Sequence, residues 1–246
     1  MTDSPNETVT NLPLFRQIVD HLKKQIVDGS LAEHEGLPSE RTIAEQHSVS
    51  RMTAHKALEA IEAEGLAYSE DRRGRFVSPP RINYNVNSMA SFVTDAKRQG
   101  VEIEVELIAD KKAIADAKLA TSLFIAEGSP LFERTRLFSS SGHTIFFETE
   151  FIAPELCPEL RKPGIRSGSE KLLGERYGTL GHTADIVVRM APIQPSDAAF
   201  LGVTAWQVGI EQEQIVRKKD GTAFCFVRQV WRGELVQFSA QAIENR

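Results

Sequence analysis

Two short helical segments joined by a tight turn are the feature that most restricts how this 246-residue chain can fold. Each follows a serine, Ser39 or Ser50, which is a favoured helix N-cap because its hydroxyl accepts a hydrogen bond from a free backbone N–H. The first helix is predicted from about Glu40 to His47, and the second from Arg51 to about Glu64, where Gly65 ends it. Helices this short are marginal on their own, so they must pack against a neighbouring element.

A longer amphipathic helix precedes the pair and a hairpin follows it. Apolar residues recur at helical spacing between Phe15 and Ile26, after Pro13 and before Gly29, which suit a helix start and end. Residues 66–78 predict two short strands around a glycine turn with arginines at the tip. This succession is typical of a winged helix-turn-helix, whose second short helix enters the major groove of DNA.

The distribution of charge agrees with DNA as a partner of this region. The chain carries 29 Lys and Arg against 34 Asp and Glu, so it is not globally basic. No acidic residue lies between Gln46 and Leu58, however, which is the turn and the start of the second short helix. Carboxylates there would be repelled by phosphates, whereas Arg and Lys release counterions from DNA.

Three stretches of this region together resemble the DNA-binding domain of the GntR family of bacterial repressors. They are LPLFRQIVDHLKKQIVDGSL, LPSERTIAEQHSVSRMTAHKALEAIEAEGL and RRGRFV, and the resemblance covers residues 12–78. It implies DNA contacts at Arg41, Arg51 and His55, the last of which is arginine in many members. The further DNA contacts expected are Thr53, Lys56, Arg72, Arg73 and Arg75.

Each of these contacts has a plainer alternative. A run of charges is usually a solvated surface, and this remains the alternative for the three arginines of the hairpin. His55 is alternatively a residue that packs between helices. Arg75 stands where the family usually has a small residue.

Beyond a linker predicted over 79–87, residues 88–246 show the pattern of a second domain. Alternation of apolar and charged residues over 101–109 predicts a strand with one solvent-exposed face. Asp220-Gly221 is a strong turn signal for a hairpin near the end. The fold class is therefore α+β, a winged helix-turn-helix followed by a mostly antiparallel sheet. Helices are predicted over 88–100, within 115–130 and over 168–178, strands over 131–138 and 145–152, and a strand followed by a helix over 182–203.

Two arginines on one predicted strand indicate a ligand face. Arg134 and Arg136 are two residues apart, so both side chains project from one face, about 7 Å apart. With a turn centred on Ser141, Arg134 would pair with Glu148, and Arg136 with an aromatic ring at position 146. Guanidinium groups grip phosphate or carboxylate through paired hydrogen bonds, so this face suits a small anion that also has hydroxyls or an amine. Spacing alone fits ion pairs on a sheet surface even better.

The second domain resembles the UTRA effector domain of the HutC-like branch of the GntR family, which is similar in fold to chorismate lyase. The resemblance rests on the R-x-R of the first hairpin, the glutamate of its returning strand, the helix before Tyr177-Gly178, and WRGELVQF. It implies effector contacts at Arg134, Arg136 and Glu148. The further effector contacts expected are Ser91, Ser169 and Trp231, with Trp231 alternatively a core residue. A glutamate common in the last hairpin corresponds to Cys225.

These features predict a bacterial transcriptional regulator, by family habit a repressor, that binds a pseudo-palindromic operator in double-stranded DNA as a homodimer. A small anionic metabolite, such as a phosphosugar, a phosphonate or the carboxylate urocanate, is expected to release it. The alternatives are an enzyme of chorismate-lyase-like fold fused to a DNA-binding domain, and an architectural DNA-binding protein without an effector. No GxSxG, P-loop, HExxH or dinucleotide-binding pattern supports the enzyme.

The remaining composition indicates a cytoplasmic protein. Two cysteines, Cys157 and Cys225, are too few for a disulfide framework. Residues 1–11 are polar and acidic, and we expect a disordered tail rather than a targeting peptide. No apolar run approaches the roughly 20 residues of a membrane helix, so no membrane partner is expected. The histidines show no metal-ligand spacing, and we expect neither a metal nor a cofactor.

Overall fold

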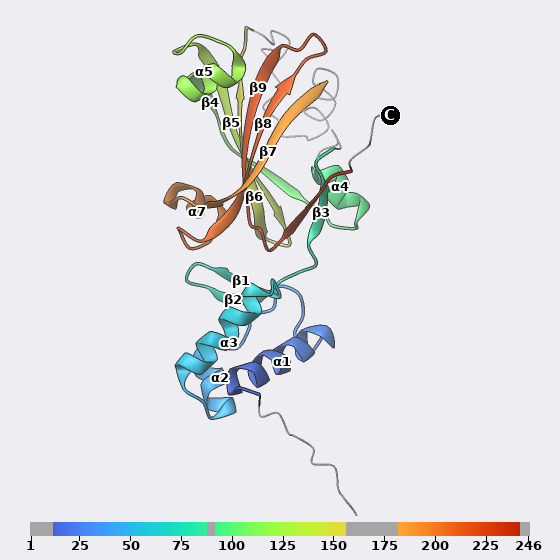
Figure 1. Ribbon diagram of the computed structural model, residues 1–246, viewed down its shortest axis with the longest axis vertical. Coiled ribbons are helices and arrows are strands. Elements are labelled where there is room, and N and C mark those ends of the chain that lie inside the picture. The colour runs from blue at the N-terminus through green and yellow to red at the C-terminus, as the bar shows by residue number, and fades with distance from the viewer. Residues whose placement is uncertain (1–11, 88–91, 156–181, 242–246) are drawn as a thin grey trace, which may run out of the picture. The chain divides into compact units, whose positions relative to one another are not determined.

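The computed structural model describes residues 12–87, 92–155 and 182–241 (Figure 1). The chain divides between Pro79 and Pro80 into two compact units. The predicted helix over 168–178 and the predicted site residues Ser91 and Ser169 lie outside the described residues.

The first unit contains the three predicted helices and the hairpin: α1 (Leu14–Val27), α2 (Glu40–His47), α3 (Arg51–Ala63), β1 (Ala67–Glu70) and β2 (Gly74–Val77). Both predicted N-caps are confirmed. The Ser39 hydroxyl accepts the N–H of Thr42, and the Ser50 hydroxyl accepts the N–H of Thr53. Each cap satisfies one of the backbone donors that a helix start leaves free, which sets where α2 and α3 begin.

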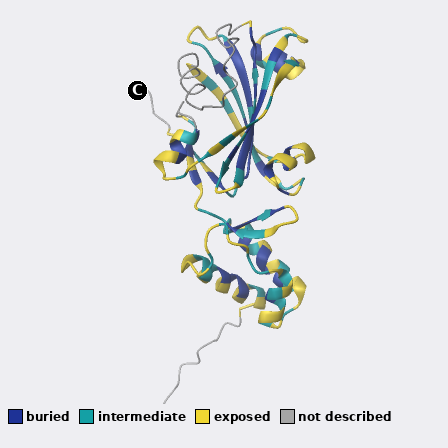
Figure 2. Cartoon of the chain, turned by 180° about the vertical axis from the view of Figure 1, so that it is seen from behind, coloured by how far each residue is buried: buried dark blue, intermediate teal, exposed yellow. Residues whose placement is uncertain are grey.

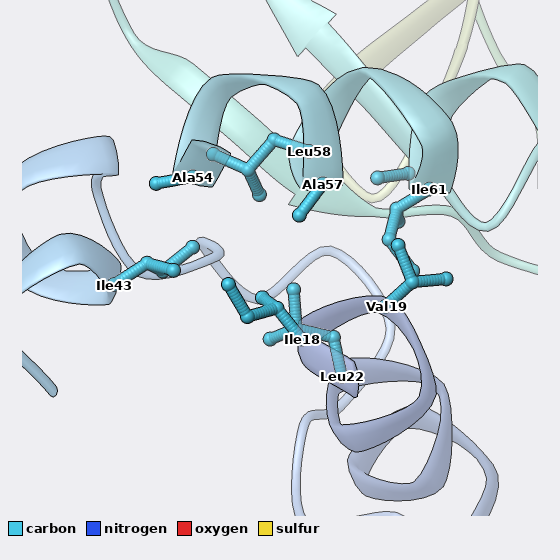
Figure 3. Packing of buried hydrophobic residues seen from close by; sticks show 9 residues of the cluster. Ile18, Val19, Leu22, Ile43, Ala54, Ala57, Leu58 and Ile61 are labelled. Atoms are coloured by element: carbon cyan, nitrogen blue, oxygen red, sulfur yellow. The ribbon is translucent and has the colours of Figure 1, made fainter. Parts of the chain in front are cut away.

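The buried stripes of the three helices meet in one core, as Figure 3 shows. Burial of a large apolar side chain contributes about 1.5–3 kcal/mol, so this core orients α3 firmly. The face of α3 that points away from this core carries Arg51, Met52 and Lys56 and is exposed. The core residues are Ile18, Val19 and Leu22 of α1, Ile43 of α2, and Ala54, Ala57, Leu58 and Ile61 of α3.

The second unit is built on a six-stranded antiparallel sheet with strand order β4-β5-β6-β9-β8-β7. The central strands are the most buried (Figure 2). Helix α5 packs on β9 and helix α7 on β6 through apolar clusters. The strands are β4 (Glu104–Ile114), β5 (Pro130–Ser140), β6 (His143–Ile152), β7 (Thr183–Pro192), β8 (Val208–Arg217) and β9 (Ala223–Trp231); the helices are α4 (Phe92–Arg98), α5 (Ala117–Leu123) and α7 (Pro195–Leu201).

Part of the predicted linker is a strand. Within 79–87, β3 (Ile82–Asn85) pairs in parallel with β10 (Val236–Ser239). Ile82 and Tyr84 are buried, and the buried side chains hold β3 in the second unit. No local signal predicted this strand, because its partner lies about 150 residues later in the chain and parallel pairing needs a long crossover.

The predicted pairing of the first hairpin is wrong by two residues. Ser141 and Gly142 both have positive φ, as a two-residue hairpin turn of type I′ requires. A bulge between Phe138 and Ser139 then shifts the register once more. Arg136 consequently pairs with Glu148, and Arg134 pairs with Glu150. The shift is even in total, so the two arginines and Glu148 still share one face.

Candidate functional site

The start of α3 presents the predicted recognition residues. Arg51 and Lys56 are exposed, and Arg51 lies in the first turn, where free backbone N–H groups favour an anion. The Thr53 hydroxyl lies 2.9 Å from the Ser50 hydroxyl, so it belongs to the cap as well as to the surface.

A concave surface, which encloses a hollow of about 480 Å³, is lined by four of the arginines that the sequence predicts as DNA contacts. Arg41 comes from α2, Arg51 from α3, and Arg73 and Arg75 from the hairpin, which is the wing. Arg41 pairs with Glu45 at 3.7 Å on an exposed helix face, and such a pair is weak enough for phosphate to replace it. The four predicted contacts that do not line this surface are Thr53, His55, Lys56 and Arg72.

Glu40 connects α2 to both α3 and the wing. Its Oε1 lies 2.8 Å from His55 Nδ1 and accepts a hydrogen bond from Arg75 Nη1 at 3.2 Å. The hydrogen bond with Glu40 raises the pKa of His55, and the same bond lowers the pKa of Glu40. Arg75 Nε also donates to Glu62 at 2.9 Å. Arg75 is therefore half-buried and braces the wing against both helices, which the sequence prediction of a DNA contact did not anticipate.

The tip of the wing carries a highly exposed cation, Arg72. Arg72 has a positive φ, its side chain is 92% exposed, and its nearest acidic partner is Asp71 at 3.5 Å. Arg73 pairs with Glu70 and lies over the Phe76 ring, 5.4 Å from its centroid. Arg72 is thus available to solvent, whereas Arg73 is partly held by its own hairpin.

In the second unit, Arg134, Arg136 and Glu148 lie close together and are almost buried. Arg136 Nη2 donates to a Glu148 oxygen and, at 2.7 Å, to Glu150 Oε1. Arg134 Nη2 donates to Asp110 at 3.2 Å. Two guanidinium groups and three carboxylates therefore form one cluster across β4, β5 and β6. The predicted residues are brought together. The wrong register had hidden Glu150 as a partner, and Asp110 joins through the pairing of β4 with β5, which was not predicted.

A hydrogen-bonded chain continues the cluster onto β9. Gln229 Nε2 donates to Glu148 Oε2 at 2.6 Å, and Trp231 Nε1 donates to Gln229 Oε1 at 3.2 Å. The Tyr84 ring stacks on Trp231 at 5.7 Å between ring centroids. Burial raises the pKa of Tyr84 to about 12, and the Glu148 carboxylate adds to the rise. Sequence reasoning missed Gln229 and Tyr84, since only the sheet and the pairing of β3 place them here.

Trp231 is fully buried in an aromatic cluster. Its ring stacks on Phe146 with 3.6 Å between centroids. Trp231 is therefore linked to the arginine–carboxylate cluster through its hydrogen bond with Gln229. Cys225, where the family commonly has glutamate, is buried in a separate apolar cluster on β9.

Over residues 12–87, 92–155 and 182–241, no group of three or more His, Cys, Asp or Glu side chains is arranged to hold a metal ion. Within the same ranges no helix is both long and apolar enough to cross a membrane.

A winged helix with a concave arginine-lined surface, joined to a sheet unit with a buried arginine–carboxylate cluster, defines a two-domain DNA-binding regulatory protein. Residues 14–77 match the family described as bacterial regulatory proteins, gntR family, and residues 98–237 match the UTRA domain. The chain belongs to the GntR family of bacterial regulatory proteins, in the HutC-like branch that carries a UTRA domain.

Several relatives are similar along nearly their whole length. The HTH-type transcriptional repressor NagR of Bacillus subtilis is 30% identical over 92% of this chain and 93% of its own. The HTH-type transcriptional repressor PhnF of Mycolicibacterium smegmatis is 28% identical over 92% of both chains. A crystal structure of PhnF from Mycobacterium smegmatis matches with a TM-score of 0.63 at 25% identity, covering 93% of this chain and all of that one. The winged helix and the UTRA domain thus occur here in the same order as in these regulators.

Proposed function

We propose that this chain is a transcriptional repressor that binds a pseudo-palindromic operator as a homodimer and is released by a small anionic metabolite. The observation that carries the proposal is the concave surface where Arg41, Arg51 and the wing converge beside the exposed start of α3. The names of NagR and PhnF as repressors support the sign of regulation. The same relatives are named as regulators rather than enzymes, and we propose no turnover of the ligand.

On DNA, the exposed face of α3 enters the major groove and the wing lies against the adjacent backbone. Arg51 reads base edges or clamps phosphate at the helix start, and Lys56 and Arg72 contribute phosphate contacts. His55 lies on the same helix, with Nδ1 near Glu40 and Nε2 near Glu59. DNA bound at the start of α3 therefore changes the surroundings of this imidazole and of its two carboxylate partners. Arg75 acts indirectly by fixing the wing.

In the UTRA domain, the chemistry of the cluster selects the ligand. An anionic group of the ligand competes with Asp110 for Arg134, since the bond between these two side chains, at 3.2 Å, is longer than the 2.7 Å bond of Arg136 with Glu150. Glu148 and Glu150 carry two negative charges, and Arg136 supplies only one positive charge between them. Hydrogen-bond donors on the ligand are therefore also favoured. A phosphosugar or amino-sugar phosphate satisfies both demands better than a simple anion does.

The route from ligand to DNA runs through β3. Tyr84 stacks on Trp231 and lies beside Glu148, and β3 begins two residues after the division at Pro80. A ligand that moves Glu148 or Gln229 therefore disturbs the strand that leads to the winged helix. Coupling between two such sites typically amounts to about 1–3 kcal/mol, which is enough to release DNA.

The DNA half is tested by fluorescence anisotropy with a labelled fragment of the gene's own upstream region. Arg51→Ala should weaken binding about 5- to 150-fold, the 1–3 kcal/mol of one specific contact. Arg98→Ala, which removes an exposed arginine from α4 in the other unit, is the matched control and should bind normally. Normal binding by Arg51→Ala would refute the assigned DNA surface.

The ligand half is tested by thermal melting with glucosamine 6-phosphate, methylphosphonate, urocanate and inorganic phosphate as probes. A bound probe raises the melting temperature by mass action. The rise should vanish in Arg134→Ala, and the same probe should release wild-type protein from DNA. A probe that releases DNA equally from Arg134→Ala would place the ligand site elsewhere.

A further inference from the structure

One glutamine of the six-stranded sheet has a buried side-chain amide whose hydrogen bonds are not made. Gln212 on β8 is fully buried. Among the residues that the structure describes, neither its Oε1 nor its Nε2 has a hydrogen-bond partner. The Tyr84 hydroxyl lies near this amide, which opposes the rise that burial causes in the pKa of Tyr84, but no hydrogen bond of ordinary length and angle joins the two side chains. A buried amide without partners is costly, so its presence needs a physical reason.

The strand register places Gln212 beside the arginine–carboxylate cluster. Gln212 lies directly opposite Gln229, which lies opposite Glu148. Glu148 in turn lies opposite Arg136. Opposed residues share a face of the sheet, so these four buried side chains form one row across β8, β9, β6 and β5. Directly opposed Cβ atoms are about 4.5–5.5 Å apart, so the two glutamine amides can meet by side-chain rotation alone.

Gln229 is held by other partners in this conformation. Its Nε2 donates to Glu148 Oε2 at 2.6 Å, and its Oε1 accepts from Trp231 Nε1 at 3.2 Å. Gln212 therefore has no partner because the neighbour that could supply one is turned away from it. A glutamine amide has both donors and an acceptor, so Gln229 could exchange its bond with Glu148 for a bond with Gln212.

We propose that Gln212 is a positioning residue of the ligand site, the second partner that Gln229 takes when a ligand occupies the Glu148 carboxylate. The inference rests on the proposed function, since it requires a ligand with a hydroxyl or amine that donates to Glu148. The ligand donor replaces Gln229 at Oε2 of Glu148, and Gln229 turns toward Gln212. Gln229 then keeps its number of hydrogen bonds, and the amide of Gln212 gains the partner that it lacks in the free protein.

This exchange lets the ligand favour one conformation over the other. A ligand shifts an equilibrium only through a difference in its interaction with the two states. The free state contains a buried amide without partners, and the liganded state does not. Turning Gln229 also moves its Oε1 away from Trp231 Nε1, and the Trp231 ring stacks on Tyr84 of β3. An ordered water at Gln212 would satisfy the amide equally in both states and would give no such preference.

A test that needs no ligand removes the Glu148 carboxylate by mutation. In Glu148→Met, Gln229 loses its acceptor, while Arg136 stays paired with Glu150 at 2.7 Å. Gln212→Met keeps the length of the side chain and removes the amide. In wild-type protein it should leave the urea midpoint of tryptophan fluorescence unchanged or raise it, because an unpartnered buried amide disappears. In Glu148→Met it should lower the midpoint by about 0.5 M, the effect of one lost hydrogen bond at a typical urea dependence.

The same strand supplies a matched control. Gln214 lies two residues along β8 on the same face, but its opposed residue is Val227, which has no amide. Gln214→Met should therefore shift the midpoint by the same amount in wild-type protein and in Glu148→Met. If Gln212→Met also shifts both equally, Gln212 does not become the partner of Gln229 and the exchange is overturned.

A second background covers the case in which Glu148→Met does not fold. Trp231→Phe keeps an aromatic ring in the cluster and removes the donor to Gln229 Oε1, which is then free to accept from Gln212. Adding Gln212→Met to Trp231→Phe should lower the urea midpoint measured by circular dichroism, although Gln212→Met alone does not. A midpoint that the added substitution leaves unchanged would refute the exchange in this background.

Ligand binding by the same variants separates the exchange from the proposed function. Glucosamine 6-phosphate carries an anion together with hydroxyl and amine donors, and its affinity should fall about fivefold in Gln212→Met, the effect of one hydrogen bond, and stay unchanged in Gln214→Met. Operator binding without the probe should be normal in both. If wild-type protein binds the probe and Gln212→Met binds it equally well, the positioning role is wrong. If no probe binds but the urea midpoints reverse as expected, the exchange between the amides stands and the proposed class of ligand fails.

Discussion

Replacing Arg136 with methionine should destabilise the UTRA domain severely. The guanidinium bridges Glu148 and Glu150, whose side chains are only 9% and 4% exposed. Methionine keeps much of the volume but leaves two neighbouring carboxylates without their shared cation. Removing one partner of a buried ion pair typically costs about 3–5 kcal/mol, because the remaining charge stays desolvated.

The chain offers a specific probe for this measurement. Its two tryptophans, Trp206 and Trp231, both belong to the second unit, so tryptophan fluorescence during urea unfolding reports on that unit. With a urea dependence of about 2 kcal/mol per molar, the expected loss lowers the midpoint by about 2 M. Adding Glu150→Gln to Arg136→Met should recover part of the loss, because one uncompensated charge disappears.

A matched control separates burial from charge. Lys118→Met removes a half-exposed cation from its salt bridge with Glu213 and should cost less than about 1 kcal/mol. If Arg136→Met lowers the midpoint no more than Lys118→Met, the cluster is solvated and the reasoning from a buried site fails. The reasoning would also fail if Glu150→Gln destabilised the Arg136→Met variant further.

Three further outcomes are expected, two in the winged helix and one at the contact between Tyr84 and Trp231. Ser50→Ala should cost about 1 kcal/mol of winged-helix stability, seen as a lower urea midpoint by far-ultraviolet circular dichroism, since it removes the N-cap of α3; an unchanged midpoint would contradict this. The pKa of His55 is raised by Glu40, so its stabilising contribution is present below the unfolded pKa and lost as pH rises through the folded value. His55→Gln should therefore flatten the dependence of the unfolding midpoint on pH above the ordinary histidine pKa of about 6.5, and an unaltered profile would exclude His55 as its source. Tyr84→Leu should keep ligand binding and operator binding but reduce the effect of one on the other, because it removes the ring that stacks on Trp231; undiminished coupling in the anisotropy titration would exclude this route.

Local chemistry made the winged helix predictable. The caps at Ser39 and Ser50 act on backbone groups three residues away, and the buried stripe of each helix follows from its own period. The arginines of α2, α3 and the wing could therefore be placed before any packing was known. The role of Arg75 could not, because its partners Glu40 and Glu62 come from two other elements.

The arginine–carboxylate cluster of the second unit shows what local patterns could not predict. Side chains alternate between the two faces of any strand, so the two-residue spacing of Arg134 and Arg136 was enough to place both on one face. Which carboxylates they meet depended on a bulge at Phe138, for which the sequence carries no strong signal. Because the bulge and turn together shifted the register by an even number, the predicted face survived while the predicted pairs did not.

By itself, the sequence determined the winged helix, the α+β class of the second unit and the residue types of both sites, since these follow from interactions over a few residues. The tertiary structure alone decided that β3 joins β10 and that Tyr84 stacks on Trp231 beside Glu148. These arrangements depend on contacts between segments far apart in the chain. Their energies come from burial and strand pairing that exist only once the whole sheet has formed.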